Sequence, residues 1–205
     1  MLNCPNFESD YLTLASHEAI SCKCFNVAIA ALSHMLEMPS CSSLSSDSRR
    51  EAVIIRNIIA LCAQESRNEL TTMLKYFNFA RSRLAEVGSV RFFGTGSMGE
   101  KEAQWYAGSS WNHGLDTAQL QKWSFCIDFL KCAADFYEVL PGTLENLELR
   151  RTSMLLAISA TLIGGIYKEE ANSNAVIREA ALYLDKCVKV DVHFLLIILE
   201  FLYHP

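Results

Sequence analysis

Apolar side chains recur at helical spacing along almost the whole of this 205-residue chain, and strict apolar–polar alternation is scarce. Segments patterned in this way form helices that bury one stripe against a neighbour, and they do not build a sheet. With 51% apolar and 20% charged residues, the chain has a globular balance and enough length to bury a core without disulfide staples. We therefore predict an all-α fold of about seven to nine helices.

Caps and breaks set the expected bounds of these helices. Pro39 ends the second helix, Ser48 and Glu51 have the S-x-x-E spacing of a capping box, and Thr143 is a plausible N-cap. The expected helices cover about residues 9–23, 25–37, 48–63, 68–87, 100–112, 117–140 and 143–167, followed by one that begins at 172–174 and one that begins at about 192. Four glycines between Gly88 and Gly99 predict an irregular loop between two subregions of a single domain, residues 1–205.

The helices follow one another in pairs joined by short turns. Such pairing predicts a helix-hairpin α-solenoid of the tetratricopeptide type. Residues 9–39 fit best, with small residues in the first helix and an apolar stripe in the second: Ala15, Ala19, Ala28, Leu32 and Met35. Small residues matter because they let two antiparallel helices approach closely. An irregular helical bundle is the alternative.

Charge and cysteine content limit the binding partners and the cellular compartments that we expect for the chain. A net charge of −5 argues against a duplex-binding domain, and we expect no direct nucleic-acid contact, although the mildly basic stretch from Arg49 to Arg91 keeps a weak one open. The start of the chain lacks the pattern of a signal peptide. The most apolar run, 194–199, falls far short of the ~20 residues that cross a bilayer. We expect the eight cysteines to be reduced thiols in a cytosolic or nuclear protein.

No enzyme or cofactor motif has the context that it would need. The stretch from Gly94 to Gly99 matches G-x-G-x-x-G, but no strand precedes it, so a loop is expected and a phosphate cradle is the second hypothesis. Cys22 and Cys24 lie near His17, yet no second ligand pair has zinc spacing. His113 is expected at a helix end, where an imidazole can cap carbonyls. We expect a protein that is not an enzyme and has no catalytic, cofactor-binding or metal-binding residues.

The three tryptophans of the chain fall close together, at Trp105, Trp111 and Trp123. Because an α-helix has 3.6 residues per turn, Trp105 and Trp111 cannot share one narrow stripe. One ring fits the core of a hairpin, and the other fits the junction with the preceding repeat. The alternative is that one ring lines a groove for a partner.

The segment from Glu102 to Gly114, EAQWYAGSSWNHG, resembles the W-x-x-x-x-x-W-N-x-G signature of a family of meiotic tetratricopeptide-type proteins, the yeast Zip-four / Spo-twenty-two kind with plant and animal relatives. The next stretch, from Trp123 to Tyr137, is similar to that family's following helix. The resemblance is specific over about residues 100–140. It implies architectural roles for the motif residues Trp105, Trp111, Asn112 and Gly114. Trp111 would pack in the core, Asn112 would tie the helix end to the next turn, and Gly114 would allow a left-handed exit from the helix.

The resemblance also implies a function. The family is non-enzymatic and links meiotic recombination complexes to the synaptonemal complex and the chromosome axis, so nuclear localisation and partners among those proteins are expected. A tetratricopeptide adaptor of another nuclear or cytosolic pathway is the alternative. Family members are several times longer, which suggests a fragment. The apolar terminal helix then offers three candidate partner-binding residues: Phe194, Ile197 and Phe201.

Overall fold

The computed structural model describes residues 5–38, 47–64 and 70–167, together with positions 178, 181, 182 and 185. This part of the chain is all-helical, which confirms the predicted class, and it contains eight helices and no strand. The helices are α1 (Pro5–Ser21), α2 (Phe25–Glu37), α3 (Asp47–Gln64), α4 (Leu70–Val87), α5 (Ser89–Phe93), α6 (Gly96–Gln119), α7 (Trp123–Glu138) and α8 (Leu144–Tyr167). Of the predicted helix beginning at 172–174, four positions are described, and the one predicted from about residue 192 lies outside the described residues.

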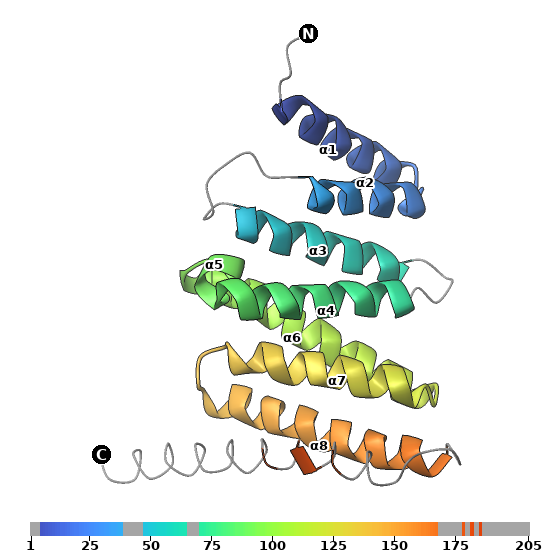
Figure 1. Ribbon diagram of the computed structural model, residues 1–205, viewed down its shortest axis with the longest axis vertical. Coiled ribbons are helices and arrows are strands. Elements are labelled where there is room, and N and C mark those ends of the chain that lie inside the picture. The colour runs from blue at the N-terminus through green and yellow to red at the C-terminus, as the bar shows by residue number, and fades with distance from the viewer. Residues whose placement is uncertain are drawn as a thin grey trace. The chain divides into compact units, whose positions relative to one another are not determined.

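The chain divides into two compact units, residues 1–96 and 97–205. In the first unit, α1 packs on α2, α2 on α3 and α3 on α4, as successive layers (Figure 1). The short α5 packs against both α3 and α4. Arg83 ties α3 to α4, because its Nε and Nη2 atoms donate to the two carboxylate oxygens of Glu51 at 2.9 and 3.3 Å. Glu51 therefore bonds to a residue of another helix. The helix α3 begins at Asp47, one residue before the predicted N-cap Ser48.

The glycine-rich interval is more ordered than the irregular loop we predicted. Gly88, Gly94 and Gly96 have positive φ angles, which interrupt the helical backbone. A helix, α5, nevertheless forms between Gly88 and Gly94, and α6 begins at Gly96. The helix buries Phe92 and Phe93, whose ring centroids lie 4.9 Å apart. Burial of two phenylalanines against α3 and α4 thus outweighs the flexibility of the flanking glycines.

In the second unit, α7 packs against α8 along its length, and α6 packs on α7 (Figure 1). The predicted N-cap of α8 is observed, because the backbone N–H of Asn146 donates to Thr143 Oγ1 at 3.2 Å. Arg150 Nη2 donates to Glu138 Oε2 at 2.9 Å and joins α8 to the end of α7. The core cluster here consists of Cys126, Leu130, Ala157 and Ala160.

Two turns in the chain have the same backbone geometry. Lys23 (φ 58°) follows α1 and Gln121 (φ 55°) follows α6, each two residues past the helix end. In both turns the next residue donates its backbone N–H to the carbonyl five residues earlier, from Cys24 at 2.8 Å and from Lys122 at 2.9 Å. These two residues also have matching angles, φ −89° and ψ 64° against φ −87° and ψ 67°. Both are Schellman turns with a non-glycine residue in the left-handed position.

Candidate partner-binding helix

The segment that carries the family-like motif lies wholly inside α6, and one face of this helix is lined by small side chains. Its buried residues recur at helical spacing and, apart from Tyr106, are small: Gly99, Ala103, Tyr106, Ala107, Ser110, Gly114 and Thr117. The hydroxyls of Ser110 and Thr117 donate to backbone carbonyls of α6 itself, at 2.7 Å to those of Tyr106 and His113. Because the side chains of this face are small and its hydroxyls already donate to carbonyls of α6, another helix can approach the face closely.

Gly114 is a point of close approach between α6 and α7. A Cβ atom added there would lie 2.9 Å from both Cγ and Cδ2 of Leu130, which is 1% exposed. Gly114 has helical backbone, so its predicted role as a left-handed exit is wrong. Close packing against Leu130 requires a glycine, and the helix continues through it for five more residues to Gln119.

Asn112 is exposed in the middle of α6, so the predicted tie between a helix end and a turn is also wrong. The helix break that we expected between residues 112 and 117 falls instead at residues 120–122, where Gln121 takes the left-handed conformation. Asn112 therefore belongs to the surface of α6 and contributes nothing to the turn.

The two tryptophans of the motif lie on different sides of α6. Trp111 is partly buried and packs against the cluster that contains Cys126 and Leu130. Trp105 is partly buried as well, and its ring meets the ring of Tyr106 edge-on, with centroids 5.3 Å apart. Trp105 and Trp111 are about 120° apart around the helix axis, and Trp111 is the one that packs against the core cluster.

Tyr106 is the large buried aromatic that sequence reasoning missed as a central residue. It is fully buried, and its ring centroid lies 5.2 Å from that of Phe136 on α7. The signal was available, because Tyr106 shares the spacing of Ala103, Ser110 and Gly114 on the small-residue face.

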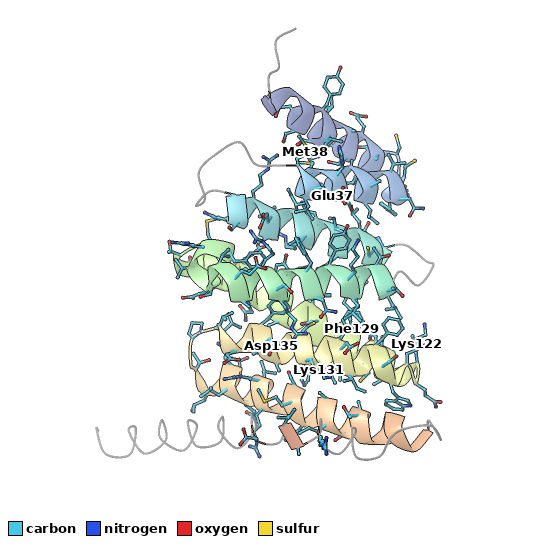
Figure 2. All side chains as sticks on the ribbon, in the orientation of Figure 1. Glu37, Met38, Lys122, Phe129, Lys131 and Asp135 are labelled. Atoms are coloured by element: carbon cyan, nitrogen blue, oxygen red, sulfur yellow. The ribbon has the colours of Figure 1, made fainter. Side chains whose placement is uncertain are left out.

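His113 does not cap a helix end, because it lies six residues before the last residue of α6. Its ring is half-buried and lies against the ring of Phe129 from α7, with centroids 5.6 Å apart (Phe129 is labelled in Figure 2). Burial lowers the pKa of His113 below its ordinary value of 6.5, and the nearby Asp116 carboxylate opposes that shift. A neutral packing side chain is the result.

The outer face of α6 lies opposite the small-residue face. It carries exposed Lys101, Asn112 and Asp116, with Trp105 between the first two. Gly108 lies on the same side, and a Cβ atom added there would meet nothing within 4 Å. We call Lys101, Trp105, Gly108, Asn112 and Asp116 the Trp105 face. It combines one aromatic ring, open space over a glycine and polar groups of both charges, and of these the aromatic ring is the feature that is enriched at protein interfaces.

Other predicted sites have different outcomes. The candidate partner-binding residues Phe194, Ile197 and Phe201 lie outside the described residues. Within the described ranges, no three His, Cys, Asp or Glu side chains come together as a metal ion would require. No helix in those ranges is both long and apolar enough to cross a membrane. No protein-family model matches the chain, and no solved structure matches it.

Proposed function

We propose that the chain is a non-enzymatic helical-repeat scaffold that binds a segment of another protein. The observation that carries this proposal is the repetition of one hairpin geometry, in α1–α2 and in α6–α7. Two hairpins with the same left-handed turn and the same backbone hydrogen bond are expected when a chain is built from copies of one supersecondary unit.

The packing residues of the two hairpins follow the same spacing. A small buried residue of the first helix, Ser16 or Gly114, precedes a small buried residue of the second, Ala28 or Cys126, by twelve positions. Buried leucines follow four residues later, Leu32 and Leu130 in turn. A tetratricopeptide unit places a glycine in its first helix and an A-x-x-x-F pair in its second, and both hairpins fit this arrangement with conservative replacements.

The resemblance of residues 100–140 gives the scaffold a more specific role. We propose that it joins recombination proteins to synaptonemal-complex or chromosome-axis proteins in meiotic nuclei. A repeat adaptor of another nuclear or cytosolic pathway is the alternative. Trp111 and Gly114 suit the architecture of such a repeat, since both pack within the second unit. Trp105 and Asn112, the other two residues of the motif, are partly exposed and exposed, which supports a role in contact with a partner.

We propose that the Trp105 face is the binding surface. Helical repeats bind peptides and helices on extended concave surfaces, and we place the surface of this repeat on α6, the first helix of its hairpin. Tryptophan is among the residues that most often dominate binding energy at interfaces. The open space over Gly108, next to Trp105, gives an incoming apolar side chain a place against the ring.

The test is a direct binding measurement with the purified chain and purified meiotic recombination and synaptonemal-complex proteins. The double variant Trp105→Ala, Asn112→Ala is expected to weaken binding at least tenfold, because loss of an interface tryptophan commonly costs about 2 kcal/mol or more. Leu120→Ala is the matched control, since it removes a 60% exposed apolar side chain at the hairpin turn, away from the Trp105 face.

Each outcome decides a different part of the proposal. Equal binding by the double variant and the wild type, with unchanged melting, moves the binding surface away from α6. Binding to none of the meiotic proteins rejects the meiotic role and leaves the adaptor alternative. Unfolding of the double variant identifies Trp105 as a packing residue, as in the junction interpretation of its ring.

A further inference from the structure

The turn between α1 and α2 presents two thiols separated by one residue. Cys22 and Cys24 are both exposed, and Lys23 between them holds the left-handed position of the turn. The other three described cysteines, Cys62, Cys126 and Cys132, are buried. The described part of the chain therefore displays its accessible thiols at one point.

The turn itself does not need these thiols. The turn between α6 and α7 has the same backbone geometry, and it carries Leu120 and Lys122 at the equivalent positions. A structural explanation for a cysteine pair, such as burial or a required packing contact, is therefore missing at Cys22 and Cys24. Exposed thiols are also the ones that small oxidants reach.

The geometry of the turn brings the two cysteines within bridging distance. A left-handed residue is the mirror image of a helical one, so the Cα atoms on either side of it lie about 5.4 Å apart. Disulfides span Cα–Cα distances of about 4.4–6.8 Å. The Cys24 thiol also points toward Cys22, because its Sγ atom lies 3.7 Å from the carbonyl oxygen of Cys22.

We propose that Cys22 and Cys24 form a reversible dithiol–disulfide pair that a small-molecule disulfide, such as oxidised glutathione, closes and reduced glutathione reopens. One cysteine thiolate attacks a sulfur of oxidised glutathione, the S–S bond breaks, and a glutathione thiolate leaves and takes up a proton. The second thiolate attacks the protein sulfur of this mixed disulfide, forms the bond between the two Sγ atoms and releases the second glutathione. Two protein thiols are oxidised, and one molecule of oxidised glutathione becomes two of reduced glutathione.

Such a bridge acts as a sensor and not as a staple. Because it encloses a single residue, it removes very little freedom from the unfolded chain. Exposed bridges are also the labile ones, and disulfides in reducing compartments are usually transient and regulatory. The pair is expected to follow the ratio of reduced to oxidised glutathione.

Lys23 makes the test direct, because it is the sole Lys or Arg among residues 1–48 and lies between the two cysteines. Trypsin therefore places Cys22 in peptide 1–23 and Cys24 in peptide 24–49. The full chain with Cys4→Ser and Cys41→Ser, which leaves one cysteine in each peptide, is equilibrated with glutathione at graded ratios and quenched. Free thiols are then alkylated, and the digest is analysed by non-reducing mass spectrometry.

We expect the two peptides to be linked by a disulfide and to carry no glutathione. The linked form should exceed the mixed disulfide with glutathione at least tenfold, and it should disappear as the concentration of reduced glutathione is raised. With Cys24→Ser added, Cys22 should instead carry one glutathione. Glutathione on either cysteine without joined peptides, at every ratio, would overturn the proposal. So would joined peptides that reduced glutathione cannot separate. Leu120→Cys with Lys122→Cys should close at a similar ratio, and failure of that pair would overturn the geometric argument.

Discussion

Two glycines of the same helix are expected to respond in opposite directions to replacement by alanine. Gly108 and Gly114 both lie inside α6 with helical backbone, so alanine gives each the same gain of about 0.5–1 kcal/mol from helix propensity. At Gly108 the new methyl group meets nothing within 4 Å, and the gain stands alone. Gly108→Ala should therefore stabilise the protein by that amount.

At Gly114 the methyl group would enter space that Leu130 already fills, 2.9 Å from its Cγ and Cδ2 atoms. Leu130 is 1% exposed within the core cluster, so it has little room to move. Overpacking of this kind costs about 1–3 kcal/mol. Because the propensity gain is common to both variants, the free energies of unfolding of Gly108→Ala and Gly114→Ala should differ by about 1–3 kcal/mol.

Urea unfolding followed by far-ultraviolet circular dichroism measures this difference. A second pair of proteins, Leu130→Ala with and without Gly114→Ala, tests the cause, because the cost at Gly114 should shrink when Leu130 is shortened. If Gly114→Ala stabilises the protein as much as Gly108→Ala does, the close approach of α6 and α7 is refuted. An undiminished cost in the Leu130→Ala background would place the clash elsewhere.

Three further expectations concern single contacts. In urea unfolding, Trp111→Ala should lower the free energy of unfolding by about 2–4 kcal/mol, which is below the 3–5 kcal/mol typical of a fully buried ring. Trp105→Ala should lower it by less than about 1 kcal/mol. Equal costs would contradict the different placement of the two rings. The pKa of His113 is lowered in the fold, so the unfolded chain takes up the proton first as the pH falls below 6.5 and stability should decline there; His113→Gln should remove that part of the pH dependence. Arg83→Lys should cost about 0.5–1.5 kcal/mol of unfolding free energy by urea unfolding, because a lysine ammonium lacks the planar pair of donors by which Arg83 binds both carboxylate oxygens of Glu51. Glu51→Gln added to Arg83→Lys should then cost little more.

The parts of the fold that depend on local chemistry were predictable from sequence. The bounds of α2 agree with the expected 25–37, because an apolar stripe runs through it and Pro39 follows closely. Thr143 caps α8 as expected. A threonine at the start of a helix accepts a hydrogen bond from a backbone N–H of the first turn, and this local contact does not depend on what the helix packs against.

The candidate site was predicted less well, because its structure depends on a contact distant in sequence. Asn112 and Gly114 have the composition of a helix end, yet the helix continues through both. The deciding factor is Leu130, on another helix, against which the bare backbone of Gly114 packs. A glycine that keeps the spacing of Ala103 and Ser110 on one helix face indicates close helix packing, and that periodicity is the better guide at such positions.

The buried hydroxyl groups of the second unit have a mechanical consequence. Ser110, Thr117, Ser153 and Thr161 all donate to carbonyls of their own helices, at 2.7 to 2.8 Å. Cohesion between α6, α7 and α8 at these positions therefore comes from apolar contact, which has no preferred direction. Helices joined in this way can slide by small amounts without breaking a hydrogen bond at these hydroxyls. Relative displacement of these helices is therefore opposed at these four positions by side-chain packing alone.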